Sequence, residues 1–275
     1  MTRPQLAPLL STVVIGLAAA VFRILRPRAR VYAKAMVMER LSPTWVNPTK
    51  YGPVTFYCPG VWPYSRSDMA KEPETTRWIE SFDDNDIFWD VGANVGVYSL
   101  LAARKGHLVY AFEPAAGNYF VLSRNVELND LADRITFLNV ALADKSSLGA
   151  LVMNDTAVGS AQHNFDVADP QIAARAFRQS CIGYSIDDFI QIFNAPVPSH
   201  LKIDVDGIED KIILGARTTL RNPALKSVLL EIRPDERRAL IRRELREAGL
   251  TQISPREDAN TTQNYVFRRV SQMAN

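Results

Sequence analysis

The chain has 275 residues, of which 47% are hydrophobic and 23% charged, as expected for one large globular domain with an appendage. Its two cysteines, Cys58 and Cys181, exclude a disulfide framework and a cysteine-based metal cluster. The first 50 residues carry eight Lys and Arg residues against the single acid Glu39, so the net charge of +2 hides an acidic body. An acidic body argues against nucleic acid as a partner.

The N-terminal region joins an apolar stretch to a basic cluster. Leu6–Phe22 contains no charged residue, and four arginines follow it at once: Arg23, Arg26, Arg28 and Arg30. As a helix this stretch would measure about 26 Å, slightly less than the roughly 30 Å of a membrane's hydrocarbon core. We therefore expect residues 1–40 to form a hydrophobic and basic helical extension.

Three alternatives remain open for this extension. It spans or re-enters a membrane, it lies on the membrane surface with its arginines toward anionic lipid, or it packs as a soluble helix. A cleaved signal peptide is less attractive because the arginine cluster would follow the cleavage site directly. The favoured alternatives attach residues 6–30 to a membrane and leave the large domain in the cytoplasm, on the cytoplasmic face.

Residues 41–71 are rich in proline and aromatic residues and read as an ordered lead-in, with a short strand at 54–57. A helix is expected from 74 to 82, beginning just after Pro73. The domain proper then extends over residues 72–275.

The centre of the domain is the stretch from Ile87 to Tyr98. It predicts a buried strand, a tight glycine turn and the start of a helix over 95–104. Gly92 permits backbone angles closed to other residues, and Asn94 tolerates them next best. Gly96 would let the helix and a ligand approach each other closely.

This turn is not a dinucleotide fingerprint, because the second and third glycine positions hold Asn94 and Val97. Asp90 precedes the turn, where it would repel a pyrophosphate but suit a ligand bearing an ammonium group. S-adenosylmethionine is such a ligand: it has an amino-acid end, a sulfonium and no phosphate. A nicotinamide-dependent oxidoreductase is disfavoured on the same grounds.

The remaining pattern alternates strands and helices, which predicts an α/β fold with a largely parallel sheet. Strands are expected at 108–112, 135–138, 201–205, 227–232 and 264–268, and helices at 117–128, from Ser185 onward and at 235–247. Residues 145–184 interrupt this alternation, and their glycines and polar residues indicate a hairpin or lid inserted over the site.

Three further polar positions are candidates for the site. Glu113 ends a strand about 20 residues after the glycine turn, where a carboxylate grips the hydroxyls of a ribose. Lys202 and Asp204 point to one face of a buried strand, so they form either a structural ion pair or part of a catalytic site. The segment 139–142 is placed to line an adenine pocket.

Several motifs occur in one order along the chain: Asp-Val-Gly-Ala-Asn-Val-Gly-x-Tyr at 90–98, Ala-Phe-Glu-Pro at 111–114, Lys-Ile-Asp-Val-Asp-Gly-Ile-Glu at 202–209 and Leu-Leu-Glu-Ile at 229–232. Together they resemble the FkbM family of S-adenosylmethionine-dependent methyltransferases over residues 72–232. The resemblance implies a class I methyltransferase fold, Rossmann-like, with seven strands of which the last is antiparallel. It also implies O-methylation of hydroxyls on sugars or polyketide-like products. The chain departs from the family at Asp206, where glutamate is usual.

From the residues and the resemblance together we predict the site. The cofactor-binding residues are expected to be Asp90, Gly92, Ala93, Asn94, Gly96, Tyr98, Glu113, Pro114, Asn118, Ala141 and Asp204. Asp204 and His163 are the candidate general bases, whereas His107 and His200 precede strands at the far edge. Asp204, Asp206 and Glu209 lack the further ligands that a divalent cation needs, so no metal is predicted.

The predicted acceptor is a small molecule or glycan: a sugar, glycolipid or polyketide-like hydroxyl compound. An alternative remains, in which the chain binds S-adenosylmethionine without catalysis and serves as a membrane-tethered partner protein.

Overall fold

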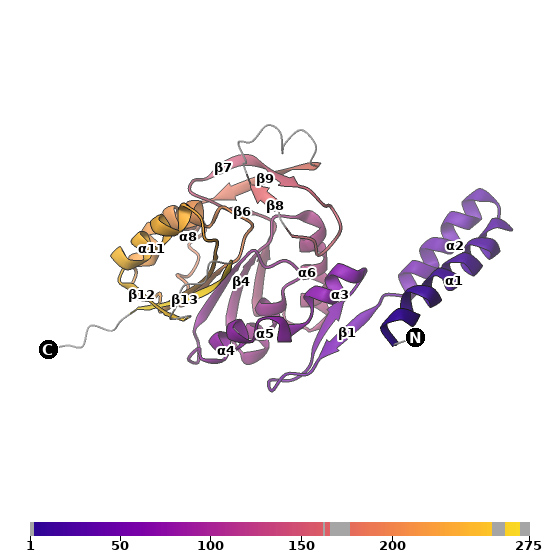
Figure 1. Ribbon diagram of the computed structural model, residues 1–275, viewed down its shortest axis with the longest axis horizontal. Helices are drawn as coiled ribbons and strands as arrows, with labels where there is room; N and C mark the ends of the chain where they lie inside the picture. Colours follow the sequence, from indigo (N-terminus) through magenta and orange to yellow (C-terminus); the bar gives the residue numbers. More distant parts are fainter. Residues whose placement is uncertain (1–2, 162, 166–176, 255–261, 270–275) are drawn as a thin grey trace. The chain divides into compact units, whose positions relative to one another are not determined.

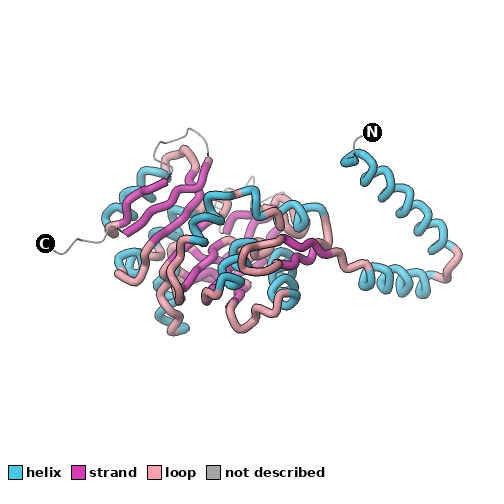
Figure 2. The backbone as a smooth tube through the Cα atoms, turned by 90° about the horizontal axis from the view of Figure 1, so that it is seen from below, coloured by secondary structure: helices cyan, strands magenta, loops and turns pink. Residues whose placement is uncertain are grey.

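The chain divides into two units, Met1–Pro43 and Thr44–Asn275, in the computed structural model, which describes residues 3–161, 163–165, 177–254 and 262–269. The first unit consists of two helices, α1 (Arg3–Arg23) and α2 (Pro27–Arg40), joined by a short loop (Figure 2). The Arg30 side chain closes the loop: its Nε donates to the carbonyl of Phe22 at 2.9 Å, and its Nη2 donates to those of Arg23 and Leu25 at 3.1 Å. A cation at the end of α1 compensates carbonyls that no helical N–H reaches.

The second unit is built on a seven-stranded sheet. Its strands are β3 (Ile87–Val91), β4 (Leu108–Phe112), β5 (Ile135–Leu138), β10 (His200–Ile203), β11 (Ser227–Ile232), β12 (Leu250–Ser254) and β13 (Gln263–Arg269). Their order is β12-β13-β11-β10-β3-β4-β5. Six of these strands run in one direction, and β13 runs in the opposite direction between β12 and β11. The chain reverses its strand order beside β3, so the carboxyl end of β3 is where a ligand is expected. The predicted class I methyltransferase fold is confirmed.

Helices cover both faces of this sheet (Figures 1 and 2). One face carries α4 (Pro73–Glu80), α5 (Val97–Lys105) and α6 (Ala116–Leu128), and the other carries α8 (Ile186–Phe193), α9 (Glu209–Leu214), α10 (Arg217–Arg221) and α11 (Arg237–Glu247). Successive residues of a strand therefore enter different cores: Phe88 packs with the first group of helices and Trp89 with the second. Burial on both faces explains the nearly continuous apolar runs that predicted parallel strands.

The lead-in packs against α6 of the same unit. It contains β1 (Thr44–Asn47), β2 (Val54–Tyr57), α3 (Val61–Arg66) and the 3₁₀ turn η1 (Met69–Lys71). Two asparagines of α6 pair with the edge of β2: Asn125 Oδ1 accepts from the Tyr57 N–H at 2.7 Å, and Asn129 Oδ1 accepts from the Thr55 N–H at 2.8 Å. Side-chain amides thus complete the hydrogen bonding of a strand edge. These contacts hold β2 against α6, and the chain from α3 onward therefore starts next to the domain that carries the main sheet.

The predicted insertion forms three strands of a second sheet, and β6 from the segment before it supplies the fourth, in the order β6-β9-β7-β8. Its strands are β6 (Ala141–Leu142), β7 (Ser147–Met153), β8 (His163–Phe165) and β9 (Phe177–Tyr184). Figure 1 shows this sheet at one end of the main sheet. Residues 162 and 166–176 of the insertion lie outside the described residues.

One strand of the main sheet was not predicted from its own pattern. Strand β12 follows Gly249 directly and is largely exposed, and only Leu250 of its residues is buried. Its residues are mostly polar, so neither an apolar run nor a clear alternation marks it. It forms because β13 offers an edge with which it pairs antiparallel.

Candidate active site

The glycine turn after β3 has the backbone conformation that its residues favour. Gly92, Asn94 and Gly96 have φ values of +82°, +51° and +86°. A Cβ atom on Gly92 would lie 2.0 Å from the backbone oxygen of Asp204, a distance that no side chain tolerates. Gly92 therefore lets the ends of β3 and β10 lie directly against each other.

Gly96 serves a different purpose from the one expected. Its missing Cβ makes room for Leu122 of α6, whose Cδ1 would lie 2.4 Å from that atom, and Gly96 does not line the cavity described below. The close approach that it permits is between α5 and α6. The distinction was not visible in the sequence because a glycine at a helix start suits a ligand and a neighbouring helix equally.

Glu113 lies beside the turn and is 4% exposed. Its Oε2 accepts from the Asn94 N–H at 2.8 Å and its Oε1 accepts from the Ala115 N–H at 2.9 Å. Burial raises the pKa of Glu113 to about 7, although the two backbone donors act in the opposite direction. Oε2 keeps a lone pair for a further donor, and the second donor to Oε1, Asn118 Nδ2, is distant at 3.5 Å, so a ligand with two adjacent hydroxyls fits this group.

Asparagine side chains tie the insertion to the glycine turn. Asn118 Oδ1 accepts from the Gly159 N–H at 2.6 Å, and its Nδ2 donates to the Ser160 carbonyl at 3.1 Å. Asn94 Nδ2 donates to the same carbonyl at 3.1 Å, while its Oδ1 is buried and has no hydrogen-bond partner among the described residues. A buried acceptor without a donor is unusual and fits a ligand that supplies one.

A buried cation occupies the floor of the site. Lys202 is 2% exposed, and its Nζ lies 2.8 Å from Asp204 Oδ2 and 3.8 Å from Asp90 Oδ1. Burial would lower the pKa of Lys202, but the two carboxylates raise it above its usual value. The ring of Tyr98 covers the ammonium at 5.2 Å, and Ser99 donates to Asp90 at 2.6 Å. The structural ion pair considered from the sequence is thus present, with Asp204 one-third exposed on its open side.

These groups surround a cavity of about 340 Å³ at the carboxyl ends of β3, β4, β10 and β11. Most of the predicted cofactor-binding residues line it: Gly92, Ala93, Asn94, Tyr98, Glu113, Pro114, Asn118, Ala141 and Asp204. Asp90 and Gly96 do not, because Asp90 is buried within β3 beside Lys202 and Ser99, and Gly96 faces Leu122 of α6. The insertion contributes Leu151 and Phe165 to the wall, and its strand β8 brings His163 into the same cavity as Asp204.

His163 lines this cavity without a strong partner for its ring. Its Nε2 lies 3.2 Å from the Ser160 hydroxyl, and its Nδ1 is buried and has no hydrogen-bond partner within the part of the chain that the structure describes. Burial lowers the pKa of His163, so the imidazole is neutral near pH 7. Its backbone N–H donates to Asp206 Oδ2 at 3.3 Å.

The cavity has further charged lining residues that the sequence did not single out: Arg66, Asp68, Lys71 and Glu72 from the lead-in, and Glu231 at the end of β11. Glu231 carried a usable signal, because an acid at the carboxyl end of a parallel strand faces the same edge as Asp204. The lead-in residues carried none, since nothing in a proline-rich segment indicates which part of the fold it crosses. Among the described residues no group of three or more His, Cys, Asp and Glu side chains is arranged to hold a metal ion.

Comparison with known proteins agrees with this geometry. The order of strands and the glycine turn define a class I methyltransferase. Residues 90–250, more than half of the chain, match the family described as "Methyltransferase FkbM domain". The chain belongs to this family, and the resemblance seen in its motifs is confirmed.

Individual relatives are more distant. A hexuronic acid methyltransferase of Haloferax volcanii is 23% identical over 168 residues, which are 60% of this chain and 64% of that protein. The methyltransferase sdnD of Sordaria araneosa is 41% identical over 75 residues, 26% of this chain and 28% of that protein. The chain thus spans less than two thirds of the length of these relatives. The crystal structure of a methyltransferase FkbM from Methylobacillus flagellatus superimposes with a TM-score of 0.45 at 18% identity, over 68% of this chain and 44% of that one.

S-adenosylmethionine is the methyl donor that this family membership implies, and the residues present fit it. Glu113 offers two acceptor oxygens to a ribose diol, and the unpartnered Asn94 Oδ1 offers an acceptor to an ammonium group. Val140, Ala141 and Leu142 supply an apolar wall for a purine. The volume also lies within the range of small-molecule sites.

Proposed function

We propose that the protein is an O-methyltransferase that transfers the methyl group of S-adenosylmethionine to a hydroxyl of a sugar, a glycolipid or a polyketide-like molecule. One observation carries the proposal: the carboxylates Asp204, Asp206 and Glu231 line the same cavity as Glu113. Hydroxyl groups are hydrogen-bond donors, so a wall of carboxylates suits an acceptor rich in hydroxyls. The hexuronic acid methyltransferase among the relatives supports a sugar.

The charges of the cavity favour a neutral acceptor. Its lining holds three basic side chains, Arg66, Lys71 and Lys202, against six acids: Asp68, Glu72, Glu113, Asp204, Asp206 and Glu231. Lys202 is already neutralised by its two partners, and Lys71 Nζ bonds to Ser65. An acceptor with its own carboxylate would enter a field of like sign, which weakens its binding.

Bound S-adenosylmethionine supplies an electrophilic methyl carbon, and the protein holds the acceptor oxygen in line with it. Such positioning supplies a large part of the rate enhancement of a displacement reaction. Glu113 and the glycine turn fix one end of the donor, while the ends of β10 and β11 present carboxylates that orient the acceptor hydroxyl. The covering insertion keeps water from the reacting atoms, because Leu151 and Phe165 form part of the wall.

A transfer assay tests this proposal. The full chain is incubated with methyl-labelled S-adenosylmethionine and a panel of neutral sugars, glycolipids, uronic acids and polyketide-like alcohols. We expect label on a neutral hydroxyl compound. Asp204→Asn removes a carboxylate that orients the acceptor hydroxyl, so we expect a loss of about 100-fold in kcat with S-adenosylhomocysteine binding retained. No transfer to any acceptor by a chain that binds S-adenosylhomocysteine would favour the inactive, membrane-tethered partner instead.

We further propose that α1 inserts into a membrane and holds the methyltransferase domain on the cytoplasmic face. Leu6–Arg23 is long and apolar enough to cross a membrane, with a mean hydropathy of 1.9, and none of it is buried against the protein. Val13, Val14 and Ile15 are all exposed, so apolar side chains surround the helix and do not form a single stripe. Its two hydroxyls, on Ser11 and Thr12, bond internally to the Pro8 carbonyl at 2.8 and 2.9 Å. Such a helix is suited to a lipid interior more than to its surface.

Membrane fractionation of full-length variants tests the anchor. Val14→Arg together with Leu17→Arg places two charges in α1 without touching any packed residue. We expect the wild type in the membrane fraction and this double variant in the soluble fraction, because an arginine at the centre of an inserted helix costs about 2.5–3.5 kcal/mol. A matched pair of substitutions on exposed residues of α2, Val31→Arg and Met38→Arg, should leave the distribution unchanged. A double α1 variant that stays with the membranes would contradict the anchor.

A further inference from the structure

We propose that Glu231 is the general base of the methyl transfer, the group that takes the proton from the acceptor hydroxyl. This inference rests on the proposed O-methyltransferase function and names the residue that carries out its proton transfer. The sequence pointed instead to Asp204 and His163.

The sheet register brings Glu231 beside Asp204 on one face. Strands β10 and β11 are parallel, with Lys202 opposite Leu229 and Ile203 opposite Leu230, and Asp204 and Glu231 are the residues that directly follow this last pair. Residues in register on neighbouring strands point to the same face, and alternate residues of a strand share it. Asp204 and Glu231 therefore emerge together, one row beyond Lys202, and both line the cavity.

Residues from three other parts of the fold lie around this face. On β13, Asn264 lies opposite Glu231, and its Nδ2 donates at 3.1 Å to Glu72, the residue preceding α4. Tyr98 of α5 covers Lys202, with its ring 5.2 Å from the ammonium. The charged and titratable groups around Glu231 are thus Lys202 of β10, Asp204 and Asp206 of the following loop, Arg233, Glu72 and Tyr98.

Within the described part of the chain, Glu231 differs from the other cavity acids in having no hydrogen bond or ion pair to its side chain. Asp204 is held by Lys202 at 2.8 Å, and Asp206 lies 3.7 Å from Arg233. Each of these two carboxylates is therefore already engaged by a cation, which competes with a ligand for its oxygens. Glu231 is half-buried and free to accept a proton from a ligand in the cavity.

Its proton affinity suits the task. Burial, together with the charges of Asp204 and Asp206, raises the pKa of Glu231 to about 7, against the weaker opposing effects of Arg233 and Lys202. A general base works best when its pKa lies near the operating pH. His163 is neutral in the same cavity, but its pKa is lowered by burial, which makes it the weaker base.

The step balances as follows. The acceptor's O–H bond breaks as Glu231 takes the proton, a bond forms between that oxygen and the methyl carbon, and the carbon–sulfur bond breaks with its electron pair remaining on sulfur. The products are the methyl ether, S-adenosylhomocysteine and a protonated Glu231, which returns its proton to water.

The test compares Glu231→Gln, His163→Asn and the exposed control Glu236→Gln in the full-length protein. We expect Glu231→Gln to lower kcat by about 100- to 10,000-fold and to abolish the limb of the pH–kcat profile near pH 7, while S-adenosylhomocysteine affinity changes less than about threefold. Glu236→Gln should match the wild type in both respects. A Glu231→Gln enzyme that keeps the limb, or a His163→Asn enzyme that loses it, would overturn the proposal.

A second readout needs no acceptor. The infrared difference between wild type and Glu231→Gln across pH 5–9 should contain one carboxyl band that titrates near pH 7. Absence of that band would overturn the base assignment even if no acceptor were found. Conversely, a protein that shows this band but has no turnover would indicate that the proposed O-methyltransferase function is wrong. The proton affinity assigned to Glu231 would still stand.

Discussion

Lys202 Nζ lies 2.8 Å from Asp204 Oδ2 at the end of a buried strand, and the same ammonium is 3.8 Å from Asp90 on the neighbouring strand. This one cation therefore compensates two carboxylates, of which Asp90 is 1% exposed and Asp204 opens into the cavity. The pair connects the fold to the site. It holds the ends of β3 and β10 together where the donor and the acceptor are expected to meet.

Replacing Lys202 by Met should destabilise the protein strongly. Removing one partner of a buried ion pair leaves the other charge uncompensated, at a cost of about 3–5 kcal/mol in the free energy of unfolding. The loss should grow as the pH rises, because Asp90, whose pKa is raised by burial, then ionises without a cation. Urea unfolding measures it, with Lys50→Met as the control, since the Lys50–Glu80 pair is exposed and solvent screens it, so its loss should change the stability little. Equal losses in the two variants would be incompatible with this role.

Alanine at Gly92 should cost more than alanine at Gly106. Both glycines have positive φ, +82° and +113°, so both substitutions carry backbone strain of about 1–3 kcal/mol. A Cβ at Gly92 would also collide with the Asp204 carbonyl at 2.0 Å, whereas one at Gly106 meets nothing within 4 Å. We expect an extra loss of about 1–3 kcal/mol and weakened S-adenosylhomocysteine binding for Gly92→Ala alone. Similar thermal unfolding of both variants would show that the strand ends have room to separate.

Glu113→Gln should weaken cofactor binding while the fold persists. Glutamine keeps one acceptor oxygen, so either the Asn94 or the Ala115 N–H loses its partner and one ribose hydroxyl loses its acceptor. The loss of charge-assisted hydrogen bonds predicts a decrease of about 10- to 100-fold in S-adenosylhomocysteine affinity. Glu127→Gln, on the exposed side of α6, is the matched control and should bind like the wild type. Unchanged affinity in Glu113→Gln would place the ribose elsewhere.

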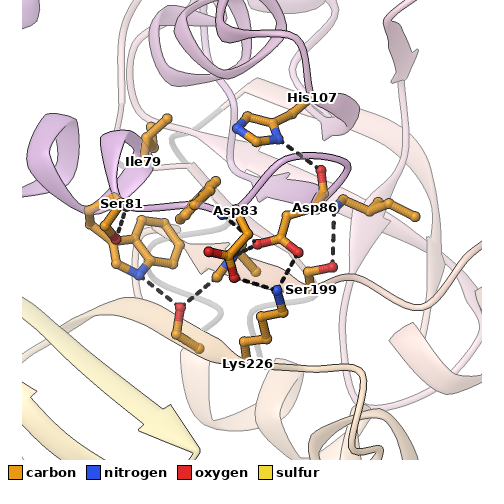
Figure 3. Close-up of polar contacts among 12 residues, drawn as sticks. Ile79, Ser81, Asp83, Asp86, His107, Ser199 and Lys226 are labelled. Carbon is orange, nitrogen blue, oxygen red and sulfur yellow. Dashed lines mark hydrogen bonds and ion pairs between the residues drawn. The ribbon is translucent and has the colours of Figure 1, made fainter.

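A buried network at the opposite end of the sheet should govern acid stability. Asp86 Oδ2 lies 2.8 Å from His200 Nε2, and Lys226 bridges Asp86 and Asp83 at 2.7 and 2.8 Å, as Figure 3 shows. Ser227 Oγ lies 2.7 Å from His200 Nδ1 and accepts from Trp78 Nε1. Burial lowers the pKa of His200 to about 4, so its contact with Asp86 is a hydrogen bond from a neutral ring at pH 7.

The sign of the effect follows from the unfolded pKa of histidine, about 6.5. Between pH 6.5 and 4 the unfolded chain binds a proton at this histidine, whereas folded His200 stays neutral. The contribution of His200 to the free energy of unfolding is therefore complete above pH 6.5, and about 3 kcal/mol of it is lost as the pH falls to 4. Glu113, Glu209 and Glu231, with pKa values raised to about 7, act in the opposite direction between pH 4.5 and 7. Comparing urea unfolding of wild type and His200→Gln over pH 4–7.5 isolates the histidine. Parallel stability curves would contradict this assignment.

Much of the fold could be predicted because its signals are local. The apolar runs at β3, β4, β10 and β11 follow from burial on both faces, and the turn conformations of Gly92 and Asn94 follow from their residue types. The polar strand β12 could not be predicted, because it exists only through its pairing with β13. The four-stranded arrangement of the insertion was likewise hidden, since β6 and β9 pair across more than thirty residues of sequence.

Site residues could be predicted from the sequence where they belong to a local motif. They could not be predicted where distant segments of the chain meet. Glu113 and Asp204 stand at strand ends that sequence spacing locates. Arg66 and Glu72 reach the cavity only because asparagines of α6 fix the lead-in, a long-range contact without a sequence signature. Glu231 was recognisable as an acid at a strand end, but its lack of a partner is a property of the folded environment.

Calorimetric titration of the full chain with S-adenosylhomocysteine, with NAD as the control ligand, tests the central claim most directly. We predict saturable binding of one S-adenosylhomocysteine per chain, weakened in Glu113→Gln, and no heat with NAD. Absence of binding, or binding that Glu113→Gln leaves unchanged, would mean that the turn after β3 and its acidic neighbour do not form the cofactor site.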